Sequence, residues 1–255
     1  MLKALLVRAR LGHGTRPPGG PLQEGIPGRP VFKPQLCREG CAACVAACPT
    51  RALEPGRLDL GRCILCTDCA RACPAGAVEF TSEPAMATRR REDLVLEGEV
   101  LRLAEALEER SRRLFGRSLR LRQVSAGGCN GCEVESNVLG TPAFDLGRFG
   151  IGFVASPRHA DGILVTGPVT RNMEAALLET WRAVPAPRLV IATGACAISG
   201  GPFEGSPEVR GGLEGLLPVD LYIPGCPPHP LTTLDGLLRL LGREEASAHG
   251  GAGGG

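Results

Sequence analysis

Twelve cysteines divide this chain of 255 residues into two regions of very different cysteine density. Eight of them lie between Cys37 and Cys73, and the other four are spread from Cys129 to Cys226. The first residues are too short and too charged for a secretory signal, so we expect a cytoplasmic protein. Disulfides are rare in the reducing cytosol. We therefore expect metal binding by these thiols to constrain the fold.

Composition excludes several classes of function. The formal net charge is +2 and 22% of the residues are charged, which argues against a basic nucleic-acid binder, so we expect no nucleic-acid partner. No apolar run is long enough to form a membrane-spanning helix. Aromatic residues make up only 4% of the chain, so a core has to be built from aliphatic side chains.

The eight clustered cysteines belong to a motif that occurs twice. Residues 43–49 align with residues 68–74, at an offset of 25 positions. The second copy has the spacing Cys-x2-Cys-x2-Cys-x3-Cys-Pro, which is that of bacterial ferredoxins with two 4Fe-4S clusters. The first copy carries one extra residue after Cys37.

This spacing predicts two 4Fe-4S clusters with crossed ligands, because the fourth cysteine of each motif ligates the cluster of the other motif. The predicted ligands of the first cluster are Cys37, Cys41, Cys44 and Cys73. Those of the second cluster are Cys48, Cys63, Cys66 and Cys69. A pair of zinc knuckles is the alternative. Zinc sites use two Cys-x2-Cys pairs separated by a spacer, whereas these cysteines are closely packed and each motif ends in proline.

Alternating apolar strands and helices are expected over residues 119–242. The expected strands are 119–124, 152–155, 163–166, 189–192 and 221–223, and the expected helices are 170–184 and 231–241. This order predicts an α/β fold, with a mainly parallel sheet and helices on both of its faces.

Changes in composition predict five segments along the chain. They are an irregular N-terminal arm (1–30), a domain with two 4Fe-4S clusters (31–82), a helical connector (83–118), a second domain with a 4Fe-4S site (119–242) and a disordered tail (243–255). The helical connector rests on the spacing of Leu96, Val100, Leu103, Leu107 and Leu114.

The last four cysteines each follow a predicted strand. Cys129 and Cys132 follow the first, Cys196 follows the fourth and Cys226 follows the fifth. The carboxyl ends of parallel strands form the ligand-binding edge of such a sheet. The spacing alone leaves open a single 4Fe-4S cluster, a zinc site or four free structural cysteines.

Four ordered segments resemble a known family. They are SAGGCNGCEVE (125–135), ASPRHADGILVTGPVT (155–170), GACAISGG (194–201) and VDLYIPGCPP (219–228). Together they resemble the small electron-transfer subunit shared by respiratory complex I and membrane-bound NiFe-hydrogenases, most closely the formate hydrogenlyase type. LGRCILC (60–66) resembles the separate two-cluster ferredoxin subunit of the same complexes. The chain thus looks like a fusion of a small ferredoxin-type α+β domain with a flavodoxin-like domain.

One feature of this resemblance favours the hydrogenase branch. Complex I has two adjacent cysteines at the first ligand position, whereas this chain has Cys129-Asn130-Gly131-Cys132. The resemblance implies a third 4Fe-4S cluster, held by Cys129, Cys132, Cys196 and Cys226, and no catalytic residue in this chain.

The resemblance also implies the setting of the protein. The expected partners are a NiFe-type large subunit, membrane-embedded subunits of the same complex, and an electron donor such as a donor subunit, a soluble ferredoxin or a formate dehydrogenase. The expected location is peripheral, on the inner face of the cell membrane. A complex I-like, quinone-reducing oxidoreductase is the near alternative, and a zinc-stabilised interaction module is the alternative from another class.

Two carboxylates flank the third site, Glu133 and Glu135. Glu135 lies three residues after Cys132, where the relatives also have an acidic residue, and we expect it to couple proton uptake to reduction. The alternative is that both are exposed carboxylates near the start of a helix.

Overall fold

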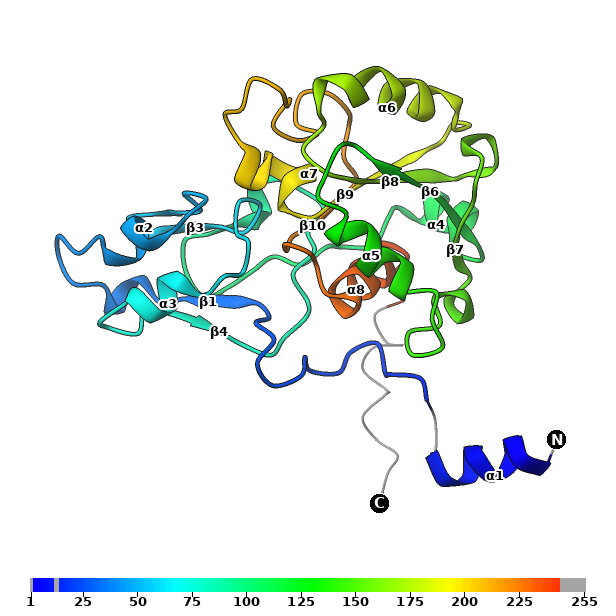
Figure 1. Cartoon of the computed structure of the whole chain (residues 1–255), viewed down its shortest axis with the longest axis horizontal. Helices are drawn as coiled ribbons and strands as arrows, with labels where there is room; N and C mark the ends of the chain where they lie inside the picture. The colour runs from blue at the N-terminus through cyan, green and yellow to red at the C-terminus, as the bar shows by residue number, and fades with distance from the viewer. Residues whose placement is uncertain (1, 12–13, 244–255) are drawn as a thin grey trace.

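Five parallel strands form the central sheet of the computed structural model, which describes residues 2–11 and 14–243 (Figure 1). The strands are β6 (Leu119–Ser125), β7 (Ile151–Phe153), β8 (Gly162–Thr166), β9 (Leu189–Thr193) and β10 (Leu221–Ile223). Their order is β10-β9-β8-β6-β7, and all four pairings are parallel. Numbered within the sheet this is the flavodoxin-like order 2-1-3-4-5, so the predicted α/β fold is confirmed.

Helices cover both faces of this sheet. On one face lie α6 (Arg171–Ala183) and the short α7 (Ala195–Ser199), and on the other lie α5 (Gly131–Val138) and α8 (Pro230–Leu240) (Figure 1). Successive residues of a strand point to opposite faces. In β9, Val190 packs on the α6 side while Ile191 packs on the α8 side. Burial on both faces explains the mainly apolar sequences of β8 and β9, in which every residue is buried, whereas the polar residues of β6 are partly or fully exposed.

The eight clustered cysteines lie in a smaller lobe, which we call the cysteine-rich lobe (residues 30–82). Its first and last strands, β1 (Pro30–Phe32) and β4 (Val78–Phe80), pair antiparallel and join the two ends of the lobe. The two copies of the repeat form matching helices, α2 (Ala43–Ala47) and α3 (Asp68–Ala72), which lie against each other. The hairpin β2 (Leu53–Glu54) and β3 (Arg57–Asp59) connects the copies, and η1 (Pro34–Leu36) follows β1.

The connector is helical only over α4 (Glu109–Phe115), and not along its length as the leucine spacing predicted. The helical turn η2 (Glu92–Leu94) leads into β5 (Val95–Leu96), which pairs with β3. Leu96 and Leu107 are buried in two different cores, whereas Val100 is 87% exposed. An extended chain that passes between two cores buries alternate leucines at separate places, and this mimics the spacing of one helix face.

The N-terminal segment was predicted to be irregular, but Leu2–Leu11 forms the helix α1, which lies apart from the body (Figure 1). Residues 14–29 run irregularly along both lobes. The amide of Arg16 donates to the carbonyl of Ala143 in the lobe that carries the sheet, and Leu22 is buried in the core beneath α8. The predicted tail from 243 onward lies almost entirely outside the described residues. The remaining elements are the helical turns η3 (Leu146–Phe149), η4 (Pro157–His159) and η5 (Gly201–Phe203).

One hydrophobic core crosses the boundary between the cysteine-rich lobe and the sheet lobe (residues 119–242). It contains Leu58 and Leu60 from the first lobe, and Val190 and Ile198 from the second. The two lobes are therefore packed as one body. In the part of the chain that the structure describes, no helix is long and apolar enough to cross a membrane.

The centre of the sheet gives a test of this packing. Leu164 of β8 is fully buried on the α8 face. We expect Leu164→Ala to lower the free energy of unfolding by about 2–5 kcal/mol, because it leaves a cavity that a parallel sheet cannot close. Leu114→Ala is the matched control, since Leu114 is 57% exposed, and it should change stability by about 0.5 kcal/mol or less. Anaerobic urea unfolding measures both, and equal effects would contradict this packing.

Candidate iron–sulfur sites

Four cysteines meet at the carboxyl edge of the parallel sheet. Cys129 and Cys132 lie in the loop and helix α5 that follow β6. Cys196 is the second residue of α7, directly after β9, and Cys226 follows β10. The strand order reverses between β6 and β8, and this switch point is where ligands bind in open α/β sheets.

The four thiols influence one another electrostatically, which places them around a common space. Burial raises the pKa of Cys132 well above its ordinary value, and the nearby Cys196 and Cys226 raise it further. Burial also raises the pKa of Cys196 to about 12, with further contributions from Cys226 and Cys129. Desolvated thiols that repel one another as anions need a bound cation to become thiolates.

Glycines at this edge let the backbone approach the sulfurs closely. Gly194 has a φ of +89°, and a Cβ at this position would lie 2.6 Å from the Sγ of Cys132. Gly201 has a φ of +52°, and a Cβ there would lie 3.2 Å from the Sγ of Cys196. The GACAISGG segment therefore needs glycine at its first position to leave room for Cys132 and at its last position to leave room for Cys196.

The acidic residue at this site is Glu133. Its side chain is 8% exposed and accepts hydrogen bonds from the Oγ of Ser125 at 2.5 Å and the Oγ1 of Thr166 at 2.7 Å. Its charge also raises the pKa of Cys132. Ser125 and Thr166 are paired neighbours on β6 and β8, so the sheet register assembles this carboxylate site. The sequence pattern identifies Glu133 as a carboxylate near the cysteines, but it does not predict that the hydroxyls of Ser125 and Thr166 bind it.

Glu135 lies further along α5 and is partly buried. Burial raises its pKa. No described side chain donates a hydrogen bond to it. Its predicted role in proton coupling stays a prediction.

A pocket in the cysteine-rich lobe contains one of the predicted ligand sets. It is lined by Cys48, Cys63, Cys66 and Cys69, together with apolar side chains that include Leu53, Leu58 and Phe80. Burial raises the pKa of Cys63 to about 12 and that of Cys69 to about 11, and Cys48 adds to both shifts. Cys48 comes from the first motif and the other three from the second. That these four cysteines hold one cluster, as the crossed assignment has it, stays a prediction.

The other set is more open to solvent. Burial and then the charge of Cys73 raise the pKa of Cys44, and Cys37 adds a smaller contribution. Cys73 is also buried in part, but backbone amides, first that of Ala77 at 3.2 Å from its Sγ, lower its pKa overall. Cys37 and Cys41 are exposed. Cys73 thus lies near Cys44 of the first motif, and its role as a ligand of that set stays a prediction.

A single zinc ion and a polynuclear cluster place different demands on the arrangement of four thiols. A zinc ion holds four sulfurs at about 2.3 Å, which requires a compact group. Among residues 2–11 and 14–243, no three His, Cys, Asp or Glu side chains are close enough to hold one ion. In addition, the buried Oγ1 of Thr193, beside Gly194, has no hydrogen-bond partner in the described structure. A sulfur-rich group between the loops would fit both observations.

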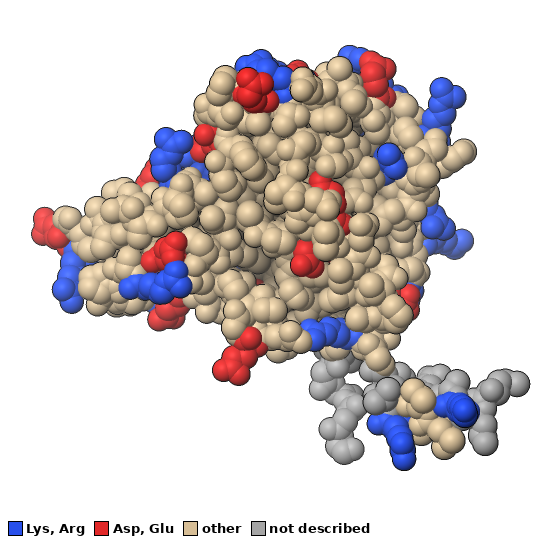
Figure 2. Space-filling model, viewed as in Figure 1, with Lys and Arg blue, Asp and Glu red and all other residues tan. Residues whose placement is uncertain are grey.

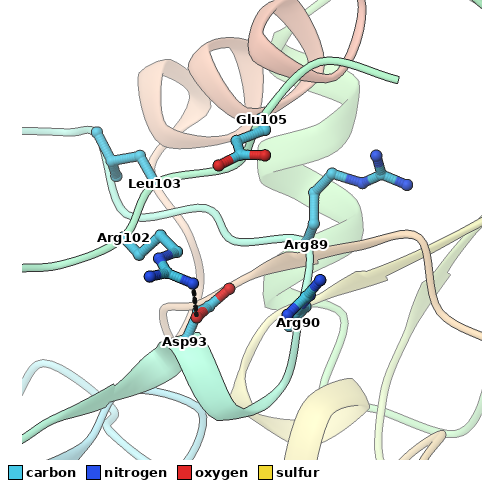
Figure 3. Close-up of a pocket in the computed structure, with 6 residues that line it drawn as sticks. All are labelled: Arg89, Arg90, Asp93, Arg102, Leu103 and Glu105. Atoms are coloured by element: carbon cyan, nitrogen blue, oxygen red, sulfur yellow. Dashed lines mark ion pairs between the residues drawn. The ribbon is translucent and has the colours of Figure 1, made fainter. Parts of the chain in front are cut away.

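A hollow of about 230 Å³ in the connector contains no cysteine (Figure 3). Its lining residues are Arg89, Arg90, Asp93, Arg102, Leu103 and Glu105. Arg102 lies 3.9 Å from Asp93 in an ion pair, and Arg89 donates to backbone carbonyls. Much of its charge is therefore already engaged within the chain.

Comparison with known proteins finds one family and several relatives of this chain. Residues 129–240 match the family described as NADH ubiquinone oxidoreductase, 20 Kd subunit. Formate hydrogenlyase subunit 7 of Escherichia coli is 49% identical over 133 residues, which are 52% of this chain and 52% of that protein. A probable membrane-bound hydrogenase subunit of Pyrococcus furiosus is 43% identical over 129 residues, 51% of this chain and 77% of that protein. An NADH-quinone oxidoreductase subunit of Bacteroides thetaiotaomicron is 44% identical over 110 residues, 43% of this chain and 56% of that protein.

A flavodoxin-like sheet with thiols at its switch point, in a chain with these relatives, defines an oxidoreductase subunit. The chain belongs to the family of the 20 kDa subunit of NADH ubiquinone oxidoreductase. It spans about half the length of the formate hydrogenlyase subunit that it matches. The matched family region begins at residue 129 and does not include the cysteine-rich lobe.

The crossed thiol sets predict distinct phenotypes. We expect Cys48→Ser to alter the cluster of Cys63, Cys66 and Cys69, and Cys73→Ser to alter the cluster of the exposed Cys37 and its neighbours, because each cysteine lies with the other motif. EPR spectra of the reduced variants distinguish the two clusters. If each variant lost the cluster of its own motif, the crossed assignment would be wrong.

The buried carboxylate predicts a change in redox potential. Reduction of a cluster held by Cys129, Cys132, Cys196 and Cys226 would add negative charge next to Glu133, so Glu133→Gln should raise the midpoint potential of that cluster by tens of millivolts. Glu135→Gln is the matched comparison on the same helix and should have the smaller effect, because the charge of Glu133 raises the pKa of Cys132 and Cys196, whereas the pKa of Glu135 is itself raised by burial. Redox titration followed by EPR measures both. A larger shift for Glu135→Gln would overturn this ranking.

Proposed function

We propose that this chain is the iron–sulfur electron-transfer subunit of a membrane-associated NiFe-hydrogenase of the formate hydrogenlyase type. The observation that carries the proposal is the convergence of Cys129, Cys132, Cys196 and Cys226 at the switch point of a flavodoxin-like sheet. The similarity to the Escherichia coli and Pyrococcus furiosus subunits supports the hydrogenase branch.

Three 4Fe-4S clusters are the proposed cofactors, and their chemistry is reversible storage of single electrons. Cys37, Cys41, Cys44 and Cys73 hold the first, Cys48, Cys63, Cys66 and Cys69 hold the second, and the four sheet-edge cysteines hold the third. The chain's own residues bury the thiols, present backbone amides to the sulfurs and fix the spacing between the sites. The catalytic centre is on a partner large subunit.

The face around α5 is the proposed surface for that partner. Cys129 is exposed there and Val134 is 50% exposed, although both lie beside the buried Cys132. In Figure 2 the lysine and arginine side chains lie towards the edges of this face, while the middle is mostly uncharged with a few acidic side chains. An interface with a buried centre has this character.

The opposite end of the relay is the exposed first site. Because Cys37 and Cys41 are open to solvent, an electron donor can approach closely there, either a donor subunit of the complex or a soluble ferredoxin or formate dehydrogenase. Membrane-embedded subunits of the same complex would hold the protein peripherally on the inner face of the membrane.

A complex I-like, quinone-reducing enzyme is the second candidate, and the relative from Bacteroides thetaiotaomicron supports it. The separation of Cys129 and Cys132 by two residues favours the hydrogenase. A zinc-stabilised interaction module is the alternative from another class, and it would require thiols grouped around one ion.

Metal analysis of the native complex tests the proposal. We expect about twelve iron atoms and as many sulfides per chain, because each cubane contains four of each, and nickel in the large subunit that co-purifies. Cys196→Ala should remove about a third of the iron, whereas Ser206→Ala, a serine in the exposed loop of the same lobe, should remove none. Stoichiometric zinc without sulfide would refute the proposal, and iron without nickel in the partner would favour the quinone-reducing candidate.

A further inference from the structure

A single serine links the cluster-bearing parts of the two lobes. Ser199, at the end of α7, lies with its Oγ 2.9 Å from the carbonyl oxygen of Gly61 and 3.1 Å from that of Ala195. Gly61 is two residues before Cys63, and Ser199 is three residues after Cys196. The contact therefore joins the segments that carry one buried cysteine of each lobe.

The backbone at Gly61 is packed without spare room. A Cβ at this position would lie 2.8 Å from the Cγ2 of Ile198 and 2.8 Å from the Cζ of Arg91. Ile198 and Leu60 belong to the core that crosses the boundary between the lobes. The glycine thus permits a close approach of α7 to the chain that leads into Cys63.

Ion pairs hold the same segment on both sides. Arg62 donates to Glu204, which follows η5, at 2.7 Å. Asp59 accepts two hydrogen bonds from Arg91, at 2.6 and 2.8 Å, and a third from the amide of Gly61 at 2.8 Å. The paired side chains are partly buried, so solvent screens these pairs less than exposed ones.

The contact between Ser199 and Gly61 also indicates which thiol set of the cysteine-rich lobe lies nearer to the sheet lobe. Cys63 belongs to the pocket with Cys48, Cys66 and Cys69, and its segment touches α7. The other set in the same lobe includes the exposed Cys37, whose segment has no described side-chain bond to the sheet lobe. The set around Cys63 is therefore the intermediate one.

We infer that Ser199 is a positioning residue for electron exchange between the lobes, with the Ser199–Gly61 hydrogen bond as the junction between the ligand sets of Cys63 and Cys196. The inference rests on the proposed function. If the proposed clusters occupy both ligand sets, the electron that the cluster held by the Cys63 set would lose is the one that the cluster held by the Cys196 set would gain, and no covalent bond changes. The hydrogen bond from Ser199 to Gly61 connects the two lobes where there would otherwise be only a van der Waals contact. The ion pairs of Arg62 and Asp59 hold the segment around Gly61 close to α7.

Ser199→Ala in the full chain, in its native complex, tests the junction. The second arm is Ser199→Thr, which restores the hydroxyl, and the matched control is Ser156→Ala, a serine that caps η4 away from the boundary. After flash reduction by an external photosensitiser, freeze-quenched EPR follows the transfer of spin from the cysteine-rich lobe to the sheet-edge site. We expect several-fold slower transfer in Ser199→Ala, recovery in Ser199→Thr and no change in Ser156→Ala. An unchanged rate in Ser199→Ala would overturn the inference.

Glu204→Gln provides a measurement that does not depend on Ser199. It weakens the pair with Arg62 without touching a thiol segment, and Glu109→Gln, which breaks the exposed pair with Arg113, is its control. We expect faster amide hydrogen exchange at residues 60–64 and weaker spin–spin coupling between the reduced sites, in Glu204→Gln only. Unchanged exchange and coupling would count against the inference, even if Ser199→Ala lost iron.

Iron and sulfide content distinguishes a failure of the proposed function from a failure of the inference about Ser199. A wild-type chain without clusters would refute the proposed function. If the chain contains its clusters but neither the electron-transfer rate nor the spin–spin coupling changes in these variants, only the role of the Ser199–Gly61 contact is refuted.

Discussion

Burial of thiols is the constraint on which the cysteine-rich lobe depends. Its strands have two or three residues and its two helices have five each, so they enclose little apolar surface of their own. Small domains of this kind usually need metals or disulfides to be stable. Cys63 and Cys69 are buried, and desolvation raises their pKa values to about 12 and about 11. A bound iron–sulfur cluster would both occupy the space between these thiols and stabilise their anionic form.

In the sheet lobe, the strand topology brings cysteines together that are distant in sequence. Its cysteines are up to 97 residues apart in sequence, from Cys129 to Cys226, and no local motif could bring them together. Parallel strands end at the same edge, so three βα loops converge there without any further device. The same register places Ser125 and Thr166 side by side, and their hydroxyls hold the buried Glu133. The acid and the thiols are thus products of one arrangement of strands.

The two lobes are not independent units, although their cysteine patterns suggested a simple fusion of domains. Leu58 and Leu60 share a core with Ile198, and the segment 14–29 contacts both lobes. A fragment limited to residues 119–242 would expose part of that core. The proposed relay would benefit from this arrangement, because packing and not a flexible linker sets the distance between the thiol sets.

The sequence by itself determined the fold class and most elements of the sheet lobe, and it predicted the thiol groups. Apolar runs such as residues 189–192 and the repeated cysteine motif are local signals, which depend only on neighbouring residues. Tertiary structure decided the rest. The connector leucines have helical spacing but are buried by an extended chain that passes between two cores. Glu133, and not Glu135, is the carboxylate bound at the site, because hydroxyls from two strands donate hydrogen bonds to it. The contact of Ser199 with Gly61 joins residues 138 positions apart. Such contacts depend on how the elements pack, which no local pattern records.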